Sequence, residues 1–372
     1  MESTFRIDQK SLAAVLSSMQ PICAKRTTLD ATTSILFQAD HKELILKSTD
    51  LEISLQYSCG LHNSDIEQGS SFLLSGKRVF DLVKELDGEI QFSLEASKVS
   101  LLAGAAELSL HVKDAQEFPP FPERIENLMQ LDAAILRSML EKVSFLIPQN
   151  NANPALNGLF IEVSDKELKM TATNGHCLAQ VRSAAYALEK PVSWLVPRRA
   201  IFELKKIIDN TPDKTIFLGV CGNQLVFSGE SFNFFTKLLA DPFPHYQPIL
   251  DKTDFVQGCV KRVDLVKALR RSACLLSGQF IPTQLSFDET MVTIAMQNKE
   301  VGALQEKIAL DNYTGSSLEI RFYAPYLLNG LQVLQDDSIS FFLISSSRPI
   351  IIETKDQSLE VTYLVMPVSP TA

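Results

Sequence analysis

The sequence of 372 residues lacks several patterns that assign a chain to a common class. Its longest apolar runs are far shorter than the 18 or more residues of a membrane-spanning helix, and residues 1–10 hold no apolar segment. We therefore expect neither membrane spans nor a secretory signal. The six cysteines form no C-x-x-C pair, which in a chain of this length favours reduced thiols in a cytoplasmic protein.

The motifs of common enzyme classes are also missing. The chain has no G-x-x-x-x-G-K-[ST], H-E-x-x-H, G-x-S-x-G or G-x-G-x-x-G, and its five histidines have no metal-ligand spacing. His176 and Cys177 stand next to each other as a possible base and nucleophile. Neighbouring residues of an extended segment point to opposite faces, which argues against a dyad. We expect no catalytic activity, no metal and no cofactor.

What the sequence does contain is a threefold repeat. The stretches "AQEFPPFPER" at 115–124 and "ADPFPHYQPI" at 240–249 share an acid before Phe-Pro, and their prolines predict stiff, irregular connectors. Apolar residues at helical spacing predict a helix early in each third, within 8–24, 132–148 and 263–278. A second helix is predicted within 75–87, 196–210 and 323–337, and alternating apolar segments before and after it predict strands.

The repeat predicts three copies of one α+β domain, each with the order helix, strands, helix, strands. We expect the boundaries at the two proline-containing connectors, which gives domains at 1–122, 123–250 and 251–372. A chain of 372 residues is too long for one hydrophobic core, so its length agrees with several domains.

Positive charge is concentrated on the predicted helices, although the net charge is −9. Lys and Arg are good helix formers, so this bias has an ordinary explanation for any one helix, and the helix at 323–337 has no basic residue. Two chains supply twelve such helices, and a ring of twelve encloses a hole roughly 28 Å wide, enough for a duplex. The DNA-binding candidates are Lys25, Arg26, Lys77, Arg78, Arg137, Arg198, Arg199, Lys205, Lys206, Lys267 and Arg270.

Five short motifs in a fixed order carry a family resemblance. They are "STDLEISL" (48–55), "NGLFIEV" (157–163), "TATNGHCLAQ" (171–180), "FPHYQPIL" (243–250) and "YLVMPV" (363–368). With the threefold repeat, they make the chain resemble the bacterial DNA polymerase III β-subunit family, the sliding clamps. The resemblance implies a head-to-tail homodimeric ring with sheets outside and helices lining the hole. It also implies sequence-independent binding of duplex DNA and no catalysis.

The resemblance further implies a hydrophobic cleft that binds a short peptide motif of the type Gln-Leu-x-Leu-Phe. The implied partners are the DNA polymerase III α subunit, the clamp loader and other proteins with such a motif. By matching motif, the cleft residues are Leu156, Thr173, Gly175, His176, Leu178, Pro244, Ile249, Val365, Met366, Pro367 and Val368. Leu275 and Leu276 match the family's apolar dimer contact, and an ordinary core role for them remains open.

The sequence departs from the family pattern around this cleft. Asn174 stands where Asp is usual, Cys177 where Arg is usual, Pro248 where some relatives have Arg, and the chain ends in "PVSPTA". These changes remove charge and donors from the rim, so we expect altered peptide preference. A competing hypothesis is a three-repeat scaffold that binds proteins without DNA, and salt-sensitive DNA association would distinguish the two.

Overall fold

The structure, a computed structural model, describes residues 3–24, 28–66, 69–95, 97–278, 280–356 and 358–368. It forms two compact units. Unit 1 consists of Met1–Ile135 with Arg199–Leu238, and unit 2 consists of Leu136–Arg198 with Leu239–Ala372. The predicted second domain, 123–250, is therefore divided between the units, and the three-domain boundaries remain a prediction.

Six α-helices lie in the described ranges, one in each predicted segment. They are α1 (Gln9–Met19), α2 (Gly76–Val83), α3 (Ala133–Ser144), α4 (Arg198–Asn210), α5 (Arg262–Ala273) and α6 (Ala324–Val333). The chain also has 3-10 turns at Asp30–Thr33, Ala115–Glu117, Pro154–Leu156 and Gln247–Leu250.

Two of the repeated helices begin at the same kind of cap. The carboxylate of Asp8 accepts a hydrogen bond from the Ser11 N–H at 2.9 Å, at the start of α1. The Asp132 carboxylate accepts from the N–H groups of Ala134 and Ile135, at 2.8 and 3.0 Å, at the start of α3. Such caps satisfy N–H groups that lack a partner within the helix, which explains why both helices begin at these positions.

Unit 1 contains two antiparallel sheets. The five-stranded sheet has the order β5 (Asn63–Ser64), β1 (Ser3–Asp8), β7 (Glu89–Leu94), β8 (Lys98–Ala103) and β9 (Ala106–His111). The nine-stranded sheet has the order β10 (Lys113–Asp114), β6 (Ser70–Ser75), β2 (Ser34–Ala39), β3 (Glu43–Thr49), β4 (Ile53–Gly60), β18 (Phe232–Lys237), β17 (Gln224–Ser228), β16 (Thr215–Cys221) and β11 (Glu126–Asp132).

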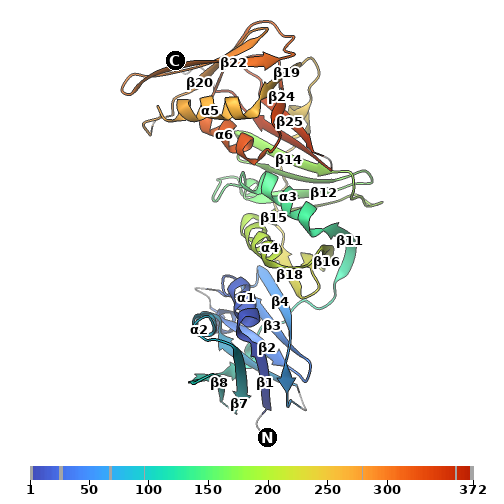
Figure 1. The fold of residues 1–372 in the computed structure, drawn as a ribbon. Coiled ribbons are helices and arrows are strands. Elements are labelled where there is room, and N and C mark those ends of the chain that lie inside the picture. The colour runs from blue at the N-terminus through green and yellow to red at the C-terminus, as the bar shows by residue number, and fades with distance from the viewer. Residues whose placement is uncertain are drawn as a thin grey trace. The chain divides into compact units, whose positions relative to one another are not determined.

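Unit 2 contains one twelve-stranded sheet. Its first half has the order β15 (Val192–Pro197), β12 (Gly158–Val163), β13 (Leu168–Thr173), β14 (Cys177–Ser183), β26 (Leu359–Val365) and β25 (Ile350–Asp356). It continues through β24 (Ser338–Leu343), β19 (Val256–Lys261), β22 (Gly302–Asp311), β21 (Met291–Asn298), β20 (Thr283–Phe287) and β23 (Leu318–Phe322). In Figure 1, α5 and α6 lie side by side on this unit.

The large sheets continue across both proline-containing connectors. In unit 1, β4 pairs with β18, and Tyr57 and Phe232 face each other with ring centroids 5.7 Å apart. In unit 2, β14 pairs with β26 in a register that joins Cys177 to Val365. Sequence reasoning treated each third as self-contained, and it also missed the strands β1, β11 and β19 that directly precede α1, α3 and α5.

Gly330 allows α6 to approach β26 closely. A Cβ atom at this position would lie 2.0 Å from the ring of Tyr363, far inside normal contact distance. The Tyr363 hydroxyl then donates to the backbone oxygen of Tyr326, one turn earlier in α6, at 2.6 Å. This contact holds the start of α6 against β26. Within the described ranges, no helix combines the length and apolar character that crossing a membrane requires.

Candidate functional site

An apolar cluster lies in unit 2 where the second connector meets the β14–β26 pair. Its buried members are Leu178, Tyr246, Ile351 and Leu364. Partly buried side chains pack against them, namely Phe160, Phe243, Ile249, Leu250, Phe255, Phe342 and Met366. Segments far apart in the sequence therefore meet here, and the cluster includes the predicted cleft residues Leu178, Ile249 and Met366.

Backbone hydrogen bonds hold the C-terminal segment beside this cluster. The N–H of Met366 donates to the carbonyl oxygen of His176, and the N–H of Val368 donates to that of Arg321, both at 2.8 Å. Between them, Pro367 has no N–H to donate. The half-buried segment 366–368 thus continues beyond β26 as far as β23.

The turn between β13 and β14 is closed by its own side chains. The Thr173 hydroxyl donates to the backbone oxygen of Cys177 at 2.7 Å. The Asn174 side-chain oxygen accepts from the N–H groups of His176 and Cys177, at 2.9 and 2.8 Å. Gly175 has a φ of 91°, a conformation that favours glycine. An aspartate would accept the same two bonds, so Asn174 preserves the turn and removes only the charge.

Tyr246 anchors the connector to the sheet. Its hydroxyl donates to the Glu162 carboxylate and accepts from the Gln180 amide at 2.9 Å and the Thr171 hydroxyl at 3.3 Å. Burial, and then the hydrogen bond to Glu162, raise the pKa of Tyr246 above its ordinary value. Sequence reasoning quoted the FPHYQPIL motif but did not assign this residue a role, although a lone tyrosine among prolines is a signal of an anchored connector.

A row of aromatic side chains extends from the turn across the start of α6. His176 stacks on Tyr326 at 5.4 Å between centroids, Tyr326 meets Tyr323 edge-on at 5.1 Å, and Tyr323 stacks on Phe280 at 4.6 Å. Phe280 is 57% exposed, unusual for a large apolar side chain. Of this row, only His176 was predicted as a site residue, because the other three carry no motif and meet it only in the folded chain.

The remaining predicted cleft residues take different positions. Leu156 and Val365 are buried, Pro244 is exposed, and neither Leu156, Val365 nor Pro244 belongs to the apolar cluster. Cys177 is only 1% exposed, and burial raises its pKa to about 11. A thiol so buried stays protonated, which argues against a nucleophile and gives Cys177 a packing role. No group of three or more potential metal ligands occurs among the described residues.

The basic residues predicted to bind DNA divide into two groups. Some are exposed, and others, called engaged below, already bond to other residues of the chain. Lys25 and Arg26 lie outside the described residues. Lys77 and Arg78 on α2, and Lys267 and Arg270 on α5, are exposed. Exposed lysines and arginines remain available to phosphates.

Several of the DNA-binding candidates on α3 and α4 already bond to other residues of the chain. The Arg198 Nε donates to the backbone oxygen of Ile147 at 3.1 Å. The Arg199 guanidinium binds the Asp50 carboxylate and also donates to the Pro21 carbonyl at 3.1 Å. Lys206 pairs with Glu203 at 2.9 Å, while Arg137 and Lys205 are half-buried and make interactions of their own. These arginines have a structural role that the sequence pattern did not reveal.

Leu275 and Leu276 are half-buried just after α5, beside one end of the β21–β22 hairpin. The buried Asn298 amide donates to the Leu275 carbonyl at 2.7 Å, and Asn298 pairs with Gly302 at the start of β22. From Gly302 to Ala309, β22 pairs with β21 on one side, and its pairing with β19 begins only at Leu310. The two leucines therefore adjoin an open stretch of sheet edge.

Three family profiles match almost the whole chain. They are those of the DNA polymerase III beta subunit N-terminal domain (residues 3–122), central domain (130–245) and C-terminal domain (253–369). The chain belongs to the DNA polymerase III β-subunit family. These matches confirm the resemblance seen in the sequence motifs and the α+β fold class.

Individual members of the β-subunit family are similar to this chain over their full length. The beta sliding clamp of Staphylococcus epidermidis is 26% identical over 379 residues, 99% of each chain. The DNA polymerase III subunit beta of Pseudomonas aeruginosa has a TM-score of 0.89 at 25% identity, over 98% of this chain and 99% of that one. A clamp from Bartonella birtlesii, bound to griselimycin, has a TM-score of 0.88 at 26% identity, over 99% of this chain and 100% of that one. These findings confirm the predicted sliding-clamp function and its non-catalytic character.

Proposed function

We propose that this chain forms a head-to-tail homodimeric ring around duplex DNA and tethers partner proteins through the apolar cluster of unit 2. The proposal keeps the three domains at 1–122, 123–250 and 251–372 as the repeating parts of the ring. The observation that carries it is the convergence of Leu178, Ile249 and Met366 in one half-open cluster. Family membership then supplies the context in which such a cluster binds a peptide.

The cluster suits a short peptide with Leu, Phe or Met anchors. Partly buried Ile249 and Met366 offer apolar contact, while His176 and the turn before it supply polar groups at the rim. Burying two or three anchor side chains contributes about 1.5–3 kcal/mol each, before the ordering costs of binding. The expected partners are the DNA polymerase III α subunit, the clamp loader and other proteins that carry a motif of the type Gln-Leu-x-Leu-Phe.

DNA contact is assigned first to the exposed basic residues Lys77, Arg78, Lys267 and Arg270. Contacts from lysine and arginine to phosphates weaken steeply with salt and carry no sequence information. We keep Lys25 and Arg26 as candidates from the sequence. The engaged residues Arg198 and Arg199 contribute less, because binding phosphate requires them to give up existing hydrogen bonds.

The dimer is proposed to join two open sheet edges. Strand β9 is the edge of the five-stranded sheet and carries half-buried Leu108 and Leu110. Strand β22 has an open stretch beside Leu275 and Leu276. Unpaired edges bind other strands readily, and a heterologous contact that closes after two steps makes a ring. We place the protein in the cytoplasm, in keeping with its six unpaired cysteines.

The test combines solution mass with retention on DNA. We expect a mass of twice the 41.4 kDa of one chain. After loading by a clamp loader, the protein should stay on nicked circular DNA and leave when the DNA is linearised. Changing Leu275 and Leu276 to Ala should give a folded monomer that is not retained. Equal retention on circular and linear DNA would refute the ring, and a dimer that ignores DNA at low salt would favour the protein-only scaffold.

A further inference from the structure

A concavity of about 680 Å³ lies on the outer face of strands β20–β23 in unit 2, and none of its lining residues belongs to the apolar cluster. Its lining mixes polar side chains, Gln284, Gln297, Gln305 and Arg321, with apolar ones such as Met296 and Leu304. The opposite face of these strands carries the buried residues of the core, such as Leu285 and Ile294. The concavity is therefore a surface feature of the sheet and not a packing defect.

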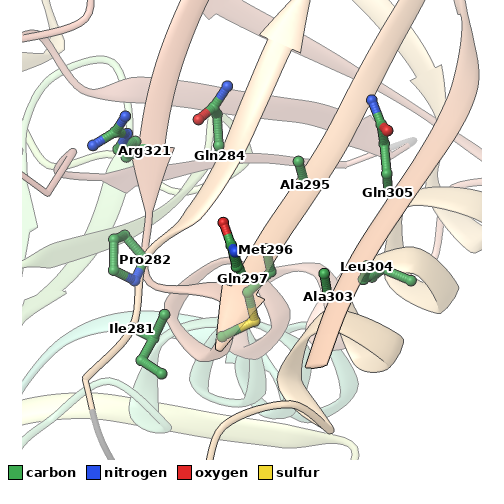
Figure 2. Close-up of a pocket in the computed structure, with 10 residues that line it drawn as sticks. All are labelled: Ile281, Pro282, Gln284, Ala295, Met296, Gln297, Ala303, Leu304, Gln305 and Arg321. Atoms are coloured by element: carbon green, nitrogen blue, oxygen red, sulfur yellow. The ribbon is translucent and has the colours of Figure 1, made fainter. Parts of the chain in front are cut away.

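The strand register explains the shape of this surface. Arg321 pairs with Gln284, Gln284 with Ala295, and Ala295 with Gln305, so these four residues form one row across the sheet. Figure 2 shows that row, with the Arg321, Gln284 and Gln305 side chains standing around the short Ala295. Ala303, beside Gln297, makes a second low point. Ala295 and Ala303 form a floor, and longer side chains, among them Gln284, Gln305 and Arg321, form the walls.

The concavity continues from the candidate cleft. Arg321 lines it, and the Arg321 carbonyl accepts the Val368 N–H, two residues after Met366 of the apolar cluster. Two residues of extended chain span about 7 Å at most. On the other side, the exposed Phe280 immediately precedes Ile281 and Pro282, which line the same concavity. A bound peptide that extends out of the cleft past Val368 and Arg321 would therefore reach the glutamines of the concavity.

The chemistry of the walls selects an extended acidic peptide. A glutamine amide both donates and accepts, so three of them complement the alternating N–H and C=O groups of a peptide backbone. Arg321 supplies a guanidinium suited to a carboxylate. Its present partner, Glu319 at 3.4 Å, is an exposed residue of the same strand, and exposed pairs of this kind are weak enough to exchange.

We propose that this surface is a second subsite, which binds an acidic, extended segment flanking the docking motif of a partner protein. The inference rests on the proposed function, because it places the flank relative to a motif bound in the cleft. The alanine floor accommodates the peptide backbone, and Arg321 binds an aspartate or glutamate of the flank. Partners with the same docking motif would then differ in affinity according to the sequence beside it.

The experiment compares three synthetic peptides on the full-length protein by fluorescence anisotropy. The first is Gln-Leu-Ser-Leu-Phe, and the others add Asp-Ser-Asp-Ser to its amino or its carboxyl end. We expect one flanked peptide to bind the wild type about tenfold more tightly than the short one. Arg321→Ala, and Ala295→Leu, which fills the floor, should each remove that gain and leave the short peptide unaffected.

Lys307→Ala is the matched control, because Lys307 is an exposed cation of the same sheet face that does not line the concavity. It should keep the full gain. A short peptide that binds with no gain from either flank would overturn the subsite alone, as would a gain that survives both Arg321→Ala and Ala295→Leu. Failure of all three peptides to bind the wild type would overturn the proposed cleft, and the subsite with it.

Discussion

The backbone N–H of Met366 donates a hydrogen bond to the carbonyl oxygen of His176 over 2.8 Å. This bond extends the β14–β26 ladder one step past Val365, into the segment that borders the apolar cluster. It holds the Met366 backbone in place independently of its side chain. The side chain can therefore be shortened without moving the segment, which makes Met366 a clean position for testing peptide binding.

Met366→Ala should weaken binding of Gln-Leu-Ser-Leu-Phe at least tenfold while the melting temperature changes little. The reason is that the half-buried side chain loses apolar contact with a bound peptide, worth about 1.5–3 kcal/mol when fully buried. Isothermal titration measures the dissociation constant. Met291→Ala serves as a control, since Met291 is also half-buried but lies at the start of β21. Unchanged affinity in Met366→Ala would locate the binding site elsewhere.

Gly330→Ala should destabilise the protein by about 1–3 kcal/mol, because overpacking forces shifts in a filled core. The added Cβ would lie 2.0 Å from the Tyr363 ring and push α6 away from β26. Without that contact the same change would stabilise the helix by about 1 kcal/mol. The sign of the change in unfolding free energy therefore shows whether Gly330 packs closely on Tyr363. Asn329→Ala, at an exposed position of the same helix, should be neutral or slightly stabilising in urea denaturation.

Charge reversal should separate the exposed from the engaged basic residues. Lys77→Glu with Arg78→Glu should reduce low-salt DNA binding and leave the unfolding free energy nearly unchanged, because both side chains are exposed. Arg199→Ala should instead lower the unfolding free energy by about 1–3 kcal/mol, because the largely buried Asp50 carboxylate loses its charged partner and keeps only the N–H groups of Glu52 and Ile53. Filter binding measures the DNA affinity of both variants, and urea denaturation measures their stability. Loss of stability in the Lys77/Arg78 variant, with loss of DNA binding alone in Arg199→Ala, would contradict the division into exposed and engaged residues.

Alkaline pH should destabilise the fold partly through Cys177. Burial raises the pKa of its thiol to about 11, while an unfolded thiol ionises near about 8.5. Between these values only the unfolded chain releases the proton, so the contribution is complete below about pH 8 and is lost as pH rises toward 11. The slope is about 1.4 kcal/mol per pH unit for one such group.

The measurement is urea denaturation at pH 7, 9 and 10. Cys177→Ala should lose less stability between pH 9 and pH 10 than the wild type does. Cys274→Ala, which removes an exposed cysteine, should follow the wild type. Identical pH dependence in wild type and Cys177→Ala would show that the buried thiol does not control this loss.

Local patterns were sufficient to predict the helices. Asp8 and Asp132 act as caps just where apolar spacing begins, and each prediction depends on a few neighbouring residues. The sheets were harder, because alternation identifies a strand but not its partner. Nothing in residues 177–183 or 359–365 reveals that β14 and β26 pair across the second connector.

The candidate site shows the same limit. The turn residues Thr173 and Asn174 bond within their own segment, so a motif captures them. Tyr326 and Phe280 join the site through contacts with residues far away in the sequence, and no local pattern marks them. Tyr246 also bonds to distant residues, and only its place among prolines gave a local signal. Likewise, Arg199 and Lys77 look equivalent on predicted helices, and only the fold reveals that Arg199 is bound to Asp50.

The β14–β26 ladder should hold the two sides of the second connector together even when the connector's backbone is cut. Residues Cys177–Arg182 pair continuously with Val365–Glu360, and Arg182 and Glu360 add an ion pair at 2.7 Å. Exposed connector positions such as Asp241 and His245 could be cut by a protease while the ladder still held the two fragments. The protein should thus remain folded after a cut in the connector. Two separately expressed fragments, divided in the connector, should associate into a complex that still contains the cleft.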